Sequence, residues 1–284
     1  MRLYCPQELI EEIIVVDNSS PRWKDWLREL PLQYGNLGKY VRIVPAAEMA
    51  VTPAHAHGWF TQQILKVKVA AVVRSDRYVI LDAKNHLITA PDREFLETAA
   101  GQPRTNGYSY RGHPMRDFLE RSLEYFGIDP QAHIDWFTRT TTPFTMVTSE
   151  ASELVRHVEQ KEGEPFASAF LRLKLSEFFL YSGFLASKGS LRQIYEITQP
   201  YQPQLWPEDC NHRSCAEAIR EANQANCYFM TIHRLALAKM TRKAKGLMAE
   251  FWRQCGLFPS VEDASRFLRD SNRSRQNCDG RVVS

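Results

Sequence analysis

Asp82, Lys84 and Asn85 directly follow the apolar run Tyr78-Val79-Ile80-Leu81. A carboxylate, an ammonium group and an amide at this spacing can bind phosphate, sugar hydroxyls or a cation. An unbroken apolar run between polar residues is typical of a strand buried on both faces of a parallel sheet. Because open α/β sheets bind their ligands at the carboxyl ends of strands, we expect Asp82 to lie in a binding site.

These three side chains leave two modes of ligand binding open. Lys84 could neutralise phosphate charge directly and so replace a metal ion. Alternatively, Lys84 points away, and Asp82 and Asn85 share a Mg²⁺ or Mn²⁺ ion through their oxygens. Asp82 could also be a turn or helix-capping residue with no ligand. The sequence therefore predicts no certain cofactor and leaves Mg or Mn at Asp82 open.

A predicted helix over residues 58–73 carries polar side chains just upstream of the strand. Gln62 and Lys66 are four positions apart and share one helix face, where they could present an amide and an ammonium group to a ligand. The alternative is a solvated polar stripe that also includes Gln63. Trp59 either packs in the core or stacks on the ligand.

Glu177 lies within the apolar stretch 176–181 of a predicted helix. A carboxylate in such surroundings must be paired or functional, because burying it alone is costly. A raised pKa would suit a general base that deprotonates an acceptor hydroxyl. The alternative is a salt bridge, for instance with Lys174 or Arg172.

The elements that must position these residues alternate between strand and helix in the first third of the chain. This alternation predicts an α/β fold with a central, mostly parallel sheet flanked by helices. After Pro91 the pattern becomes more helical, so we expect a helical C-terminal half. The predicted strands cover residues 12–18, 41–45, 78–82, 142–148 and 227–232.

Length and charge restrict the class of protein. The 284 residues fit one large α/β domain, and a net charge of +3 is too small to indicate nucleic acid as a partner. No stretch approaches the roughly 20 apolar residues that cross a bilayer. We find no secretory signal, so we expect a cytoplasmic protein whose six cysteines are reduced.

Six motifs in a fixed order carry a resemblance to a known group of proteins. They are VVDNSSP, GWFTQQILK, YVILDAKN, TPFTMV, SEFFLY and TIHR. Their order resembles that of an uncharacterised bacterial domain family within the GT-A-type nucleotide-sugar glycosyltransferase superfamily. The resemblance implies one GT-A-like domain over residues 1–258, followed by a C-terminal helix and a polar, basic tail over residues 259–284. From the resemblance we expect either that the first strand of the usual fold is missing before Glu12 or that another segment takes its place. Lys84 replaces the second acid of the Asp-x-Asp motif.

The resemblance implies a glycosyltransferase that moves a sugar from a nucleotide-sugar donor to a glycan or lipid-linked acceptor in bacterial surface polysaccharide biosynthesis. Glu177 and Asp82 are then the catalytic candidates, and association with a membrane surface stays open. The implied donor-binding residues are Asp17, Asn18, Trp59, Gln62, Gln63, Lys66, Asp82, Lys84, Asn85, His233 and Arg234. His233 could instead cap the helix that follows it. The alternative function is a catalytically inactive GT-A-like binding or scaffold protein.

Overall fold

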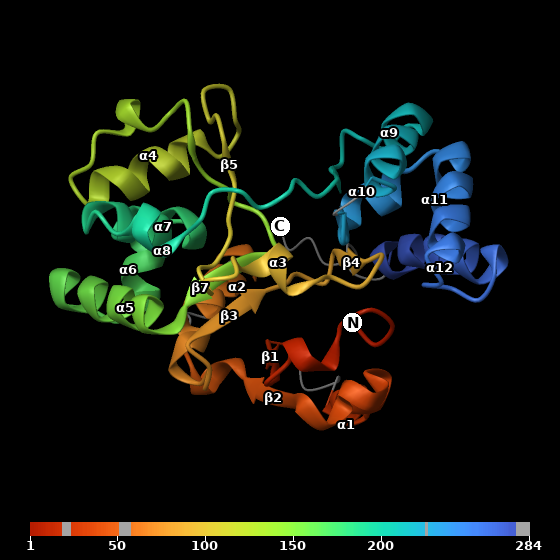
Figure 1. Ribbon diagram of the computed structural model, residues 1–284, viewed down its shortest axis with the longest axis horizontal. Helices are drawn as coiled ribbons and strands as arrows, with labels where there is room; N and C mark the ends of the chain where they lie inside the picture. Colours follow the sequence, from red (N-terminus) through yellow and green to blue (C-terminus); the bar gives the residue numbers. More distant parts are fainter. Residues whose placement is uncertain (19–23, 51–57, 225–226, 277–284) are drawn as a thin grey trace.

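The computed structural model describes residues 1–18, 24–50, 58–224 and 227–276, with the side chains of residues 1–18, 25–50, 58–224 and 227–270 (Figure 1). The fold is mixed α/β, as the sequence predicts, and it is rich in helices. The last residues of the predicted polar tail, 277–284, lie outside the described part of the chain. None of the described helices is long and apolar enough to cross a membrane.

The prediction of a central, mostly parallel sheet is wrong. In the described residues the strands form small separate sheets, of which two contain parallel pairs: β1 (Ile13–Asp17) with β2 (Val41–Pro45), and β8 (Gln204–Leu205) with β9 (Phe229–Ile232). The remaining pairs are antiparallel: β3 (Arg77–Ile80) with β7 (Phe144–Val147), β4 (Asn85–Leu87) with β9, and β5 (Gly107–Tyr108) with β6 (Phe137–Thr138).

β3 shows why the apolar run is misleading. Ile80 is buried in the largest core, whereas Val79 is 36% exposed. One face of the strand therefore packs and the other reaches the surface, which an antiparallel strand can do. A short apolar run does not distinguish this arrangement from a strand buried on both faces.

Helices gather in two lobes on either side of the short strands (Figure 1). The first lobe is built around a core of aromatic and aliphatic residues in which Phe144 stacks on Phe178, with ring centroids 4.4 Å apart. Its helices are α2 (Gly58–Lys68), α4 (Arg116–Tyr125), α5 (Thr148–Glu162), α6 (Phe166–Arg172), α7 (Glu177–Ser187) and α8 (Leu191–Ile194).

The second lobe has a separate core that is rich in alanine, methionine and cysteine and is centred on Trp252. The helices of this lobe confirm the prediction of a helical C-terminal half. Its helices are α9 (His212–Ala222), α10 (Arg234–Lys239), α11 (Arg242–Gln254) and α12 (Val261–Gln276). α12 lies within residues 259–284, the span for which the sequence predicts a C-terminal helix and a polar, basic tail, and Phe267 packs on Phe258 and Trp252.

β1, β2 and α1 (Lys24–Gln33) lie together below the two lobes, and α3 (Arg93–Leu96) lies between them (Figure 1). Short 3₁₀ helices complete the described elements: η1 (Gln7–Leu9), η3 (Gly35–Tyr40), η4 (Ala46–Glu48), η5 (Val69–Ala71) and η6 (Pro130–Ala132). β3 runs with its carboxyl end toward the middle of the molecule, so the residues that follow it lie between the lobes.

Candidate functional site

Lys66 joins two carboxylates that are far apart in the sequence. Its Nζ lies 2.8 Å from Asp82 Oδ1 and 3.2 Å from Glu177 Oε1. The three side chains come from α2, from the turn after β3 and from the first residue of α7. All are largely buried, with 13%, 19% and 6% of the side chain exposed for Lys66, Asp82 and Glu177. Their mutual contacts thus tie three elements together.

A second lysine reaches the other oxygen of Asp82. Lys84 Nζ lies 3.1 Å from Asp82 Oδ2, and the Thr142 hydroxyl donates a hydrogen bond of 3.2 Å to the same oxygen. We call Lys66, Asp82, Lys84 and Glu177 the Lys66 cluster. It contains two ammonium groups and two carboxylates, so its formal charges balance.

Asn85 holds the turn that presents Asp82. Its Oδ1 accepts the backbone N–H of Asp82 at 2.7 Å. Its Nδ2 donates to the Thr142 carbonyl at 3.1 Å and to the Thr231 hydroxyl at 2.8 Å. The amide therefore links the turn after β3 to the residue two positions before β7 and to the side chain of Thr231 in β9.

Gln63, rather than Gln62, faces the Lys66 cluster. Gln63 is 1% exposed, and its Oε1 accepts the backbone N–H of Glu177 at 3.3 Å, whereas Gln62 is exposed. The exposed Gln62 also fits the alternative of a solvated polar stripe, and its contact with a ligand stays a prediction. Residues three and four positions before Lys66 both lie near its face of the helix, and the packing of α7 decides which one is buried.

Burial and charge act on the cluster in opposite directions. Burial alone would raise the pKa of Asp82, but Lys66 and Lys84 outweigh it and hold the pKa below its usual value. For Glu177 burial prevails over the attraction of Lys66 and raises the pKa. Burial opposes the charge of Lys66 as well, yet Glu177 and Asp82 together raise its pKa. Lys66 is thus firmly cationic.

An aromatic surface adjoins Lys84. Its Nζ lies 5.0 Å from the centroid of the Trp206 ring, which is a cation–π distance. The Trp206 ring in turn lies 5.6 Å from that of His233. Trp206 is a site residue that the sequence reasoning missed, and its one signal was an aromatic residue in a proline-rich segment.

His233 caps α10, as one of the two interpretations of the sequence predicts. Its Nδ1 accepts the backbone N–H of Leu235 at 3.2 Å. Burial, together with the neighbouring cations Lys84 and Arg234, lowers the pKa of His233. The imidazole is therefore neutral near pH 7, and Arg234 is exposed.

The sequence also assigns Trp59, Asp17 and Asn18 to the donor. Trp59 packs against Phe118, with ring centroids 5.3 Å apart. Asp17 and Asn18 lie at the end of β1, in a sheet separate from the strands around the cluster. A contact of Asp17 and Asn18 with a nucleotide stays a prediction.

The residues around Asp82 do not fit a divalent metal ion. Each carboxylate oxygen already contacts an ammonium group, and the carbonyl oxygen of Asn85 accepts a backbone N–H. A cation would have to displace Lys66 or Lys84 to reach Asp82. The described residues also contain no group of three or more His, Cys, Asp or Glu side chains that could hold a metal.

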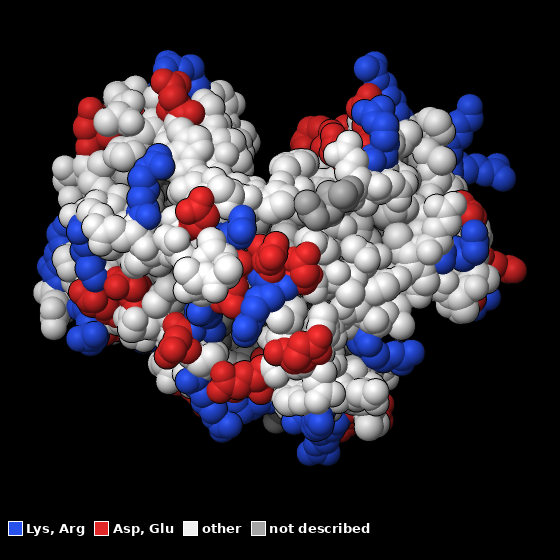
Figure 2. All heavy atoms as spheres, in the orientation of Figure 1, with Lys and Arg blue, Asp and Glu red and all other residues white. Residues whose placement is uncertain are grey.

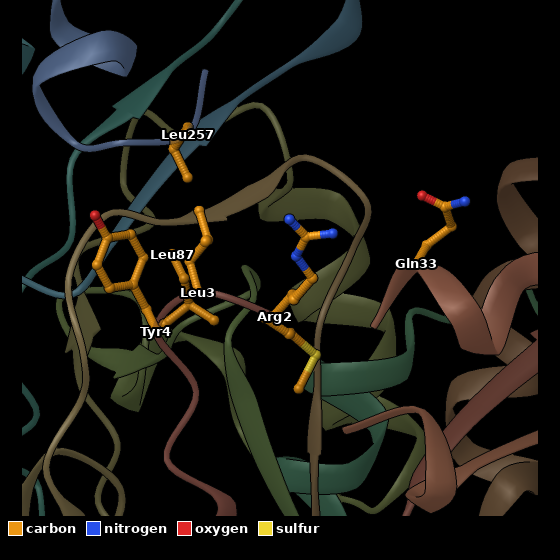
Figure 3. A pocket seen from close by; sticks show the side chains of 7 residues that line it. Arg2, Leu3, Tyr4, Gln33, Leu87 and Leu257 are labelled. Carbon is orange, nitrogen blue, oxygen red and sulfur yellow. The ribbon is translucent and has the colours of Figure 1, made fainter. Parts of the chain in front are cut away.

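The surface between the lobes is hollowed, and acidic and basic side chains are mixed over the centre of the same face (Figure 2). A separate pocket of about 220 Å³ contains none of the cluster residues. In Figure 3, Leu3, Tyr4, Leu87 and Leu257 lie at one side, Gln33 lies at the other, and Arg2 lies between them. This pocket marks the contact of the N-terminal segment with β4 and the second lobe.

Comparison with known proteins adds one relationship. No curated protein matches the chain. A family model described as a family of unknown function, DUF6492, matches residues 30–232, which include all four residues of the Lys66 cluster and end just before His233. The chain belongs to this family.

Proposed function

We propose that the protein is a glycosyltransferase that binds a nucleotide-sugar donor between the two lobes. One observation carries the proposal: Lys66, Asp82, Lys84 and Asn85, selected from the sequence as donor-binding residues, belong to one contact network after β3. The order of the sequence motifs supports the same superfamily. A glycan or lipid-linked acceptor in surface polysaccharide biosynthesis is part of this proposal.

Lys84 is the residue that meets the diphosphate. Its side chain is 23% exposed, more than the 13% of Lys66, and it lies at the Trp206 ring. Phosphate oxygens can therefore replace the Asp82 carboxylate as its partner. Once Lys84 turns to the phosphate, Asp82 Oδ2 becomes an acceptor for a sugar or ribose hydroxyl, and Trp206 offers a stacking face to a ring.

Lys66 and Glu177 have a positioning role in this scheme. Glu177 is 5% exposed and bound to Lys66, and its backbone N–H is held by Gln63. A general base must reach the hydroxyl that it deprotonates, which favours the salt-bridge interpretation for Glu177, with Lys66 as the partner. Its action as a base stays a prediction, which the rate of transfer by Glu177→Gln would test.

A thermal-shift panel of nucleotides and sugar nucleotides, with EDTA or with Mn²⁺, tests donor binding. A ligand at 100 times its dissociation constant stabilises the folded state by about 2.7 kcal/mol. We expect one sugar nucleotide to raise Tm in EDTA, and Lys84→Ala to weaken its affinity by about 1–3 kcal/mol.

Lys39→Ala is the matched control, because Lys39 Nζ also lies 5.0 Å from an aromatic ring, that of Tyr40. It should bind the donor like the wild type. If donor binding requires Mn²⁺, or if Lys84→Ala binds as tightly as the wild type, the assignment of Lys84 to the diphosphate is wrong. If no sugar nucleotide raises Tm, the proposed function fails.

A catalytically inactive binding protein is the second candidate. The full occupation of both Asp82 oxygens by Lys66, Lys84 and Thr142 favours it, because a carboxylate engaged in this way leaves the reaction no free base. Release of nucleoside diphosphate on addition of acceptor glycans separates the two candidates. Donor binding without release would support the binding protein.

A further inference from the structure

Arg139 is a buried cation without a negative partner. It follows β6, and only 2% of the residue is exposed. Its guanidinium donates to the Thr141 hydroxyl from Nε at 3.2 Å and from Nη2 at 3.0 Å, and to Gln199 Oε1 from Nη1 at 3.2 Å. Among the described residues, no carboxylate lies within ion-pair distance of it. All its partners are therefore neutral.

The guanidinium is charged at neutral pH. Burial lowers the pKa of Arg139 to about 10, which is still well above neutrality. Burying a charge without an opposite charge costs free energy, and the binding of an anion offsets a large part of that cost. Of the residues in this protein, Arg139 is thus a strong candidate to gain from an added anion.

Donors outnumber acceptors around the guanidinium. Gln204 Nε2 also donates to the Thr141 hydroxyl, at 3.2 Å, so three N–H groups converge on one oxygen. A hydroxyl oxygen has two acceptor lone pairs. If the Gln204 amide is rotated, the Thr141 hydroxyl can donate to it, but the charge of Arg139 remains unbalanced. An oxyanion supplies both the missing acceptors and the missing charge.

The segment around Arg139 also reaches the surface. Residues 199–204 provide Gln199 and Gln204 to the guanidinium and Thr141, and they contribute Pro200, Tyr201 and Pro203 to a surface pocket of about 330 Å³. Tyr201 is 63% exposed. Glu221 also lines this pocket, and the charges of both Glu221 and Arg139 act on the pKa of the Tyr201 hydroxyl. Tyr201 is thus the pocket residue past which an anionic group would approach the guanidinium.

The same segments lead to the Lys66 cluster. Thr141 accepts from Arg139, and the next residue, Thr142, donates to Asp82. Gln204 donates to Thr141, and Trp206 lies two positions further along the chain, at Lys84. A ligand that occupies one of these places is therefore close to the other.

We propose that Arg139, Thr141 and Gln204 form a binding site for an oxyanion, a phosphate or carboxylate group of a small ligand. The inference does not rest on the proposed transfer reaction. It concerns a group that balances the Arg139 charge, whichever molecule carries that group, so a failure to bind sugar nucleotides leaves it standing.

Thermal unfolding in sodium phosphate, sodium acetate and sodium chloride at equal ionic strength tests the site. With the oxyanion at ten times its dissociation constant, we expect Tm to rise by about 3 °C relative to chloride. A rise in phosphate alone assigns a phosphoryl group, and a rise in acetate assigns a carboxylate. Equal Tm values in the three salts would overturn the proposal.

Two arginine variants show whether Arg139 is the receptor. Arg139→Met should lose the rise, whereas Arg111→Met should keep it, because Arg111 is an exposed residue paired with Asp135. The same rise in Arg139→Met as in the wild type would refute the assignment. If Arg139→Met does not fold, selenate, an oxyanion with an anomalous signal, is soaked into crystals of the wild type instead: an anomalous peak within hydrogen-bond distance of the guanidinium supports the site, and its absence there contradicts it.

Discussion

Two buried cations in this protein are stabilised in opposite ways. Lys66 lies between two carboxylates, 2.8 Å and 3.2 Å from its Nζ, whereas Arg139 has hydrogen bonds to neutral groups of Thr141 and Gln199. The two sites are joined by the consecutive residues Thr141 and Thr142. The Lys66 cluster is complete within the chain, while the Arg139 site lacks a charge that a ligand can supply.

We expect the largest loss of stability when the Lys66 cluster is broken. Lys66→Met leaves Asp82 and Glu177 without their shared cation, and breaking a buried ion pair typically costs about 3–5 kcal/mol. Lys68→Met is the control, because Lys68 lies on the same helix and forms a longer ion pair, 3.7 Å, with the more exposed Glu159. This substitution should cost at most about 1 kcal/mol of stability. Urea unfolding of both variants measures the difference. Equal losses would mean that the cluster contributes no special stability.

The next largest difference in stability should separate substitutions of the adjacent residues Thr141 and Thr142. Thr141→Val removes the hydroxyl that accepts two N–H groups from a charged guanidinium, and stranding buried donors costs about 2–3 kcal/mol. Thr142→Val removes one donor to Asp82, which keeps both lysines, and should cost about 1 kcal/mol. Measuring the free energy of unfolding of the two isosteric variants tests this difference. A larger loss for Thr142→Val would reverse our ranking of the two sites.

The sequence predicted the charged site in part because its signals are local. Asp82 follows an apolar run, and Glu177 is a carboxylate within an apolar helix, so each was recognisable from its neighbours. The partner of Glu177 was not, because Lys66 lies 111 positions away and only tertiary packing brings it near. The nearby Arg172 instead pairs with Glu162 and Glu164 at the surface.

The sequence indicates the strand pairing and the Arg139 site less clearly than the Lys66 cluster. An apolar run has the same composition whether its strand packs on one face or on two, and the antiparallel pairing of β3 with β7 depends on contacts between distant segments. Thr138-Arg139-Thr140-Thr141 is a short polar stretch that resembles an exposed turn. Nothing in it indicates that the guanidinium is buried.

Removing the unbalanced charge should change stability least among the mutations of buried cations. Arg139→Met deletes a buried charge and fills much of its volume, and such replacements are often neutral or stabilising. The acceptor of Gln199 loses a partner, so we expect a free energy of unfolding within about 2 kcal/mol of the wild type. Urea unfolding in chloride measures it. A loss as large as that of Lys66→Met would show that the neutral partners alone stabilise Arg139.

The smallest effects concern pH and separate the two carboxylates of the Lys66 cluster. Burial raises the pKa of Glu177 above its ordinary value of 4.5, so the folded protein holds this proton more tightly than the unfolded chain. Ionisation of Glu177 therefore reduces stability as the pH rises from 4.5 through the folded pKa. For Asp82, the lysines outweigh burial and hold the pKa below 3.8, so its contribution is present above pH 3.8 and is lost as the pH falls through the folded pKa.

The uncharged variants Glu177→Gln and Asp82→Asn test these opposite dependences of stability on pH. The stability of Glu177→Gln relative to the wild type should improve as the pH rises above 4.5, whereas the deficit of Asp82→Asn should shrink as the pH falls below 3.8. Urea unfolding over a pH series gives both differences, and subtracting the wild-type curve at each pH removes the contributions of all other groups. A relative stability of Glu177→Gln that is flat from pH 4.5 to neutrality would show that Lys66 compensates the burial of Glu177 completely. The two carboxylates would then be equivalent partners of one lysine, and the division of the cluster into an ionised Asp82 that can receive a ligand and a Glu177 that only positions Lys66 would lose its physical basis.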